Sequence, residues 1–109
     1  MAQRVSPAQE PRVDRAVGRE RYLARLLRLI ERQKSYPGAA RRRNLEGRVE
    51  VSFTISCSGA VTDLQVAGGH GMLRKSARRA VQRALPLPAP PSGVKCPTRV
   101  RYRMLFELH

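Results

Sequence analysis

Hydrophobic and polar residues alternate most regularly between Asn44 and Val66. In the first half of this segment every second residue is apolar, which is the period of a β-strand with one buried face. These apolar positions are Val49, Val51, Phe53 and Ile55. The alternation stops at Ser58 and Gly59 and returns at Leu64. The segment therefore predicts a β-hairpin whose apolar face the rest of the chain must cover, because an isolated hairpin is only marginally stable in water.

Two other segments have the period of an α-helix. Residues 19–35 carry apolar side chains three and four positions apart, with arginines on the opposite side. The predicted apolar stripe consists of Leu23, Leu26, Leu27 and Ile30. Residues 72–85 predict a second helix, whose small apolar side chains allow close packing on a sheet. Its apolar face consists of Leu73, Ala77, Ala80, Val81 and Ala84.

Residues 99–108 alternate again and predict a long third strand. Its apolar face consists of Val100, Tyr102, Met104, Phe106 and Leu108. A helix joins the second strand to the third, so these two strands run parallel. All neighbours are antiparallel only if the third strand lies beside the first. We therefore predict an α+β fold, in which two helices pack on one face of a three-stranded antiparallel sheet of order 2-1-3.

The 109 residues are enough for one small domain. Residues 1–18 contain Pro7 and Pro11 and few large apolar side chains, which is typical of a flexible tail or the end of a linker. Residues 19–109 form the predicted domain. No apolar run approaches the roughly 18 residues that a membrane span needs, and the first residues lack the apolar segment of a signal peptide.

The formal net charge of +14 favours anionic partners, such as an acidic protein, a membrane surface or nucleic acid. A small basic nucleic-acid-binding domain is therefore an alternative interpretation. Arginines are expected in any case on the solvent-facing sides of the two helices. The tyrosines do not form a platform on which bases could stack. Charge alone supports this alternative.

Catalytic residues are not evident in the sequence. The two histidines, His70 and His109, lie in a glycine-rich loop and at the terminus, and paired carboxylates are missing. We therefore predict that the chain is not an enzyme. We also predict that it has no metal site, no cofactor and no small-molecule substrate.

The two cysteines fit no zinc or redox spacing. Cys57 follows the first strand and Cys96 precedes the third. If these strands are antiparallel neighbours, the end of one lies beside the start of the other, within the distance that a disulfide spans. Two free thiols remain the alternative, but the predicted topology favours the bridge. A bridge would imply an oxidising compartment.

The third strand lies at an edge of the predicted sheet and has no proline between Thr98 and Leu108. Its unpaired backbone groups could accept a strand from a peptide or from a second copy of the chain. Arg99, Arg101 and Arg103 would line its outer face and attract an acidic segment. The same arginines could instead only protect the edge against aggregation.

Several segments in order resemble the C-terminal domain family of TonB. They are Tyr36-Pro37, the Leu45-Glu46-Gly47 step, the alternation from Val49 to Ile55, the Ser58-Gly59 turn, the proline-rich exit of the second helix and the closing strand. The resemblance extends from about Arg19 to Leu108. The family often has Gln where this chain has Arg41, and two cysteines are not a general family feature. These differences indicate a specialised paralogue.

The resemblance implies a periplasmic domain of an energy transducer anchored in the inner membrane of a Gram-negative bacterium. Such a domain binds the TonB box, a short segment of an outer-membrane transporter for iron chelates, haem or similar nutrients, by strand addition. Energy from the proton gradient comes through an ExbB/ExbD complex. The residues expected to contact the transporter are Tyr36, Pro37, Arg41, Arg42, Arg43, Arg99, Val100, Arg101, Tyr102, Arg103, Met104 and Leu105.

Overall fold

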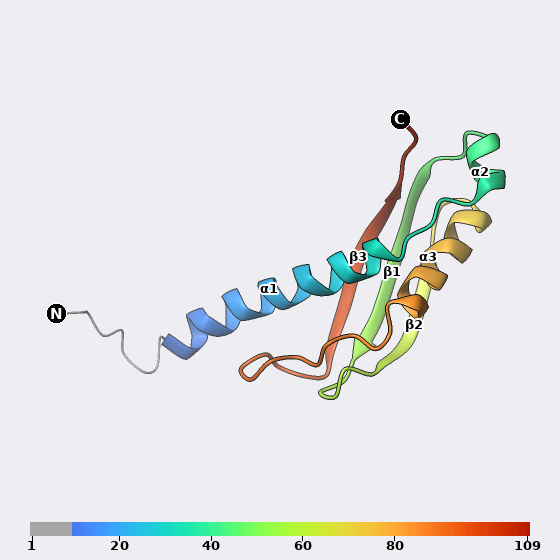
Figure 1. Cartoon of the computed structure of the whole chain (residues 1–109). Helices are drawn as coiled ribbons and strands as arrows, with labels where there is room; N and C mark the ends of the chain where they lie inside the picture. The colour runs from blue at the N-terminus through green and yellow to red at the C-terminus, as the bar shows by residue number, and fades with distance from the viewer. Residues whose placement is uncertain (1–9) are drawn as a thin grey trace.

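A computed structural model describes residues 10–109 and contains three helices and three strands (Figure 1). The elements in chain order are α1 (Glu10–Arg32), α2 (Gly38–Arg42), β1 (Gly47–Ile55), β2 (Val61–Ala67), α3 (Gly71–Arg83) and β3 (Thr98–Phe106). The sheet is antiparallel with the order β2-β1-β3, as the sequence predicts. The two long helices, α1 and α3, supply the buried side chains that face it. The predicted α+β architecture is therefore confirmed.

The central strand, β1, pairs differently with its two neighbours. Its register with β3 is unbroken, from Gly47 opposite Phe106 to Ile55 opposite Thr98. Its register with β2 shifts between Ser52 and Thr54, where β2 carries an extra residue in a β-bulge. β3 is therefore the regular edge of the sheet and β2 the irregular one.

The core lies between the sheet and the two long helices. Its largest fully buried side chains are Phe53, Phe106, Leu26, Ile30, Ile55, Leu73, Met104, Val49, Val51 and Val81. They include the whole predicted apolar face of β1, but only part of the predicted faces of β3 and α3, because Tyr102, Leu108 and Ala84 are half-buried. The apolar stripe of α1 is partly corrected, because Tyr22 is buried in it while Leu23 and Leu27 are only half-buried. The Tyr22 hydroxyl donates a hydrogen bond to the Pro88 carbonyl at 2.7 Å, in the crossover that follows α3.

The bounds of both long helices differ from the prediction. α3 starts one residue and ends two residues earlier than predicted. α1 begins at Glu10 rather than Arg19, and Pro11 lies in its first turn, where the missing N–H removes no helical hydrogen bond. The predicted tail thus overlaps this helix, and its residues 1–9 lie outside the described part of the chain. α1 also ends at Arg32, three residues before the predicted end. The basic connector predicted after Pro37 forms the short helix α2.

The predicted disulfide is present. Cys57 and Cys96 are joined, with their Cα atoms 5.1 Å apart, and the bridge ties the end of β1 to the segment that enters β3. Gly59 lies beneath the crossover with a φ of +92°, and a Cβ atom there would lie 2.6 Å from the Leu87 carbonyl oxygen. Between residues 10 and 109, none of the helices has the length and apolar character of a membrane span.

Candidate functional site: the open edge of β3

The outer edge of β3 offers backbone groups that the sheet does not use. The ammonium group of Lys34, just after α1, donates a hydrogen bond to the Leu105 carbonyl at 2.7 Å. This carbonyl therefore points away from β1. Backbone groups of successive residues in an antiparallel strand point alternately to either side, so those of Arg99, Arg101 and Arg103 face the open edge too. These residues can each present an N–H and a C=O to an added strand.

The opposite edge, formed by β2, is less suited to strand addition. The bulge places Asp63 at a positive φ of 54°, which interrupts the regular extended backbone. Arginines of α3 also reach toward this strand and the loop after it. Arg78 donates to the Leu64 carbonyl at 3.5 Å, and Arg74 donates to the Gly69 carbonyl at 2.6 Å. Bulges and charged side chains are common protections of an edge strand, so β3 is the more accessible edge.

A groove follows the β3 edge on the side of α1. It consists of two hollows of about 400 and 420 Å³, and Leu27 of α1 contributes to the wall of both. Leu23 lies in one hollow, and Glu31 and Lys34 lie in the other. The two leucines that were predicted as core residues thus form the apolar wall beside the edge. The sequence pattern could not separate this wall from the core, because both lie on the same side of the helix.

The three arginines on the outer face of β3 have different surroundings. Arg99 is held across the sheet, since its guanidinium lies 3.0 Å from the Ser52 hydroxyl and 2.9 Å from an Asp63 carboxylate oxygen. Arg103 lies 3.8 Å from the Glu50 carboxylate, and both side chains are largely exposed. Arg101 is exposed and forms no ion pair with any residue that the structure describes. Of these three cations, Arg101 is the most available to a partner.

Three of the four remaining predicted contact residues of β3 face inward, and Leu105 does not. Val100 and Met104 are buried, so only their backbone and neighbours can contact a ligand. Tyr102 is half-buried, and its hydroxyl is enclosed without a hydrogen-bond partner among residues 10–109. Burial raises the pKa of the Tyr102 phenol, and the nearby Glu31 carboxylate raises it further. Leu105 is 45% exposed and extends the apolar surface at the edge.

Two of the predicted contact residues before β1, Tyr36 and Arg41, lie at the end of the sheet where β3 finishes. The Tyr36 ring packs edge-on against Phe106, with centroids 5.6 Å apart, and its hydroxyl donates to the Leu45 carbonyl. The Arg41 guanidinium lies over the Tyr36 ring at 5.2 Å. Tyr36 therefore connects α2 to the end of β3.

Three other predicted residues are less closely tied to this edge. Arg42 and Arg43 are exposed at the end of α2. Pro37 lines a separate groove beside α3. The predicted set is thus divided between the β3 edge, the α2 region and a second surface.

Lys34, Leu27, Leu23 and Glu31 were not predicted as site residues. A basic residue just beyond a helix is usually explained by the helix dipole, so no sequence pattern indicated the contact of Lys34 with Leu105. Among the side chains of residues 17–109, no cluster of three His, Cys, Asp or Glu residues is arranged to hold a metal ion.

Comparison with known proteins identifies the family to which this fold belongs. The family described as Gram-negative bacterial TonB protein C-terminal matches residues 32–108, which include α2, α3 and the whole sheet. This chain belongs to the TonB C-terminal domain family. The family is non-enzymatic, so the prediction that the chain is not an enzyme is confirmed.

Two TonB proteins of Helicobacter pylori, from strains J99 and 26695, are each 33% identical to the chain over 86 residues. The match covers 76% of this chain but only 31% and 30% of those proteins. The chain thus spans less than a third of the length of these relatives.

Solved structures of the TonB C-terminal domain from H. pylori have the same fold. A longer form of that domain superimposes with a TM-score of 0.70 at 23% identity, covering 99% of this chain and 98% of the other. A shorter form gives a TM-score of 0.62 at 28% identity, covering 79% and 92%. The similarity to the longer form also covers α1, which precedes the region that the family matches.

Proposed function

We propose that this TonB-like domain acts in the periplasm and binds the TonB box of an outer-membrane transporter by adding it as a strand to the β3 edge. In this function the domain passes on energy derived from the proton gradient, for the uptake of iron chelates, haem or similar nutrients. The remainder of the protein would anchor it in the inner membrane and contact an ExbB/ExbD-type complex. Family membership supports this function, because TonB domains act as transducers.

One observation carries the proposal: β3 is a regular nine-residue edge with a groove beside it. Its outward backbone groups at Arg99, Arg101 and Arg103 match the hydrogen-bonding pattern of a fourth strand. Side chains of that strand alternate between two faces. One set would contact Leu27 on the side of α1, and the other set would lie near Arg101 and Leu105 on the outer face of the sheet.

The disulfide supports a periplasmic location. Disulfides persist in oxidising compartments, of which the bacterial periplasm is one. The bridge between Cys57 and Cys96 also fixes the first residues of β3 to the centre of the sheet. A partner that pulls along β3 would therefore apply force to a strand that is fixed covalently at one end. The same strand is hydrogen-bonded to β1 along its length.

A comparison of Arg101→Pro with Arg101→Ala tests the proposal. Both variants remove the charge, but only proline removes the N–H that faces the open edge. We expect a TonB-box peptide to shift the amide signals of β3 in the parent chain. Arg101→Ala should retain these shifts with weakened affinity, and Arg101→Pro should abolish them while the β1–β3 pairing persists.

Two results would contradict the proposal. In the first, the peptide would shift the amide signals only of residues on the arginine-bearing faces of α1 and α3, and the amide signals of β3 would not change. In the second, duplex DNA would bind tightly with a steep salt dependence while the peptide did not bind, which would favour the nucleic-acid-binding alternative. Pairing of two chains through β3 would appear as a concentration-dependent dimer that competes with the peptide.

A further inference from the structure

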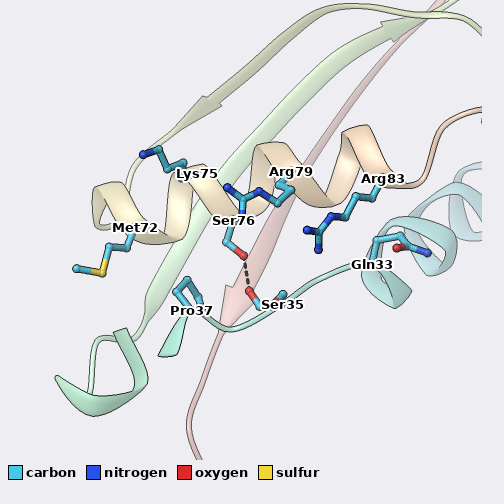
Figure 2. A pocket seen from close by; sticks show the side chains of 8 residues that line it. All are labelled: Gln33, Ser35, Pro37, Met72, Lys75, Ser76, Arg79 and Arg83. Carbon is cyan, nitrogen blue, oxygen red and sulfur yellow. Dashed lines mark hydrogen bonds between the residues drawn. The ribbon is translucent and has the colours of Figure 1, made fainter. Parts of the chain in front are cut away.

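A second groove lies between α3 and the segment that leaves α1. It has a volume of about 160 Å³ (Figure 2). Its lining residues are Gln33, Ser35, Pro37, Met72, Lys75, Ser76, Arg79 and Arg83. The Ser76 hydroxyl donates to the Ser35 carbonyl and holds the two walls together. Figure 2 shows Arg83 extending from α3 toward the segment that carries Gln33.

This groove is separate from the β3 edge, although both border the linker of residues 33–37 between α1 and α2. Lys34 turns to the Leu105 carbonyl at the β3 edge, whereas its neighbours Gln33 and Ser35 line the α3 groove. The linker therefore has one surface on each side. A ligand in the α3 groove would not occupy the backbone groups of β3.

The cations of α3 lack acidic partners. The helix carries Arg74, Lys75, Arg78, Arg79 and Arg83 and no acidic residue. None of the ion pairs among the side chains of residues 17–109 includes any of these five cations. Arg74 and Arg78 turn toward carbonyls of β2 and its following loop, whereas the other three line the groove. The groove thus has a row of cations without counter-charges.

The spacing of this row matches an extended peptide. Lys75, Arg79 and Arg83 are four residues apart, which corresponds to a rise of about 6 Å per step along an α-helix. In an extended chain, side chains on one face recur every second residue, about 6.6–6.8 Å apart. Carboxylates at alternate positions of an extended segment would therefore meet successive cations of α3.

We infer that the α3 groove binds an extended acidic segment of a protein partner, with carboxylates at alternate positions. Carboxylates accept charge-assisted hydrogen bonds from guanidinium groups, and Arg79 and Arg83 can supply two donors each in a fixed geometry. The Gln33 amide adds a neutral donor at one end of the row. The inference concerns a different surface from strand addition and does not rest on it.

Two other anionic partners fit this groove less well. Binding of an amphipathic helix to a membrane surface requires an apolar face that enters the lipid, but apart from the half-buried Met72 the large apolar residues of α3 are buried against the sheet. Single-stranded nucleic acid is usually held by aromatic side chains on which bases stack, and no aromatic residue lines this groove. A segment with carboxylate side chains needs neither feature.

Two synthetic peptides of identical composition test the inference. The first is acetyl-Gly-Glu-Ser-Glu-Ser-Glu-Gly-amide, with alternating carboxylates, and the second is acetyl-Gly-Ser-Glu-Glu-Glu-Ser-Gly-amide, with contiguous ones. Binding to the whole chain is measured at low ionic strength by amide chemical shifts and isothermal titration calorimetry. We expect the alternating peptide to bind more tightly and to shift the amides of Gln33, Ser35 and Ser76.

The double variant Arg79→Glu/Arg83→Glu should weaken binding of the alternating peptide by about tenfold or more, because two charge-assisted contacts become repulsive. The matched control is Arg21→Glu/Arg25→Glu on the exposed side of α1, with the same spacing and charge change. It should weaken binding by less than about threefold, since only screened long-range attraction is lost. Amide spectra of both variants establish that the fold is intact.

Three results would overturn the inference. The first is equal affinity of the chain for the two peptides, and the second is an equal loss of peptide affinity in the two double variants. The third is binding of anionic vesicles or single-stranded DNA that depends on Arg79 and Arg83 and is stronger than binding of the peptide. A TonB-box peptide titrated into the same samples separates this inference from the proposed function. Loss of the β3 shifts alone would contradict strand addition, and loss of the Gln33 and Ser76 shifts alone would contradict the α3 site.

Discussion

Breaking the bridge between Cys57 and Cys96 should strongly destabilise the domain. The bridge closes a loop of 39 residues, which contains β2, α3 and the crossover that follows α3. In the chain-entropy model, removing such a cross-link from the unfolded state lowers the free energy of unfolding by about 4 kcal/mol. Domains of this size are commonly stable by about 5–15 kcal/mol in total. The midpoint of thermal unfolding should fall by about 15–30 °C.

Urea unfolding of the oxidised chain, the reduced chain and the double variant Cys57→Ser/Cys96→Ser provides the measurement. The reduced chain and the double variant should unfold at similar urea concentrations, both well below that of the oxidised chain. The double variant should not respond to reductant, which controls for effects of the reductant itself. A loss of less than about 1 kcal/mol on reduction would refute the reasoning, because it would mean that the unfolded chain gains little freedom.

Four single substitutions provide further predictions. Gly59→Ala should lower the free energy of unfolding by about 2–4 kcal/mol, because φ is +92° and the new Cβ would lie 2.6 Å from a carbonyl oxygen. Gly18→Ala in α1 should raise the free energy of unfolding by about 1 kcal/mol, because the nearest atom to the new Cβ is 3.9 Å away. Lys34→Met should tighten binding of a TonB-box peptide about two- to fivefold in calorimetric titrations, because it frees the Leu105 carbonyl. Tyr102→Phe should raise the free energy of unfolding by about 1 kcal/mol at neutral pH, because it removes an enclosed hydroxyl without a partner. In the parent chain the unfolded state loses the Tyr102 proton before the folded state does, as pH rises through the ordinary pKa of 10.0. The free energy of unfolding therefore falls above that pH, and Tyr102→Phe should reduce this fall.

Each of these predictions has an outcome that contradicts it. Equal urea midpoints for Gly59→Ala and the parent chain would mean that the crossover moves aside without cost. Weaker peptide binding by Lys34→Met would mean that Lys34 assists the ligand rather than competing with it. An unchanged dependence of stability on pH in Tyr102→Phe would assign the alkaline loss to other groups.

The sequence by itself determined the elements with strong periodicity. Alternation in β1 and β3 specified which residues face the core, since a shift of one residue would expose Phe53 or Phe106 to water. The helical crossover then limited the sheet to the order that is observed. That order places Cys57 beside Cys96, so the disulfide could also be predicted.

Tertiary contacts decided the features without a periodic signal. Tyr22 is buried because the crossover supplies the Pro88 carbonyl, and Arg99 is held by residues from two other strands. The groove beside β3 exists because α1 crosses the sheet so that Leu27 faces the edge of β3. Local sequence specifies which face of an element is apolar, but only the packing of distant segments decides whether that face is filled by the core or left open to a partner.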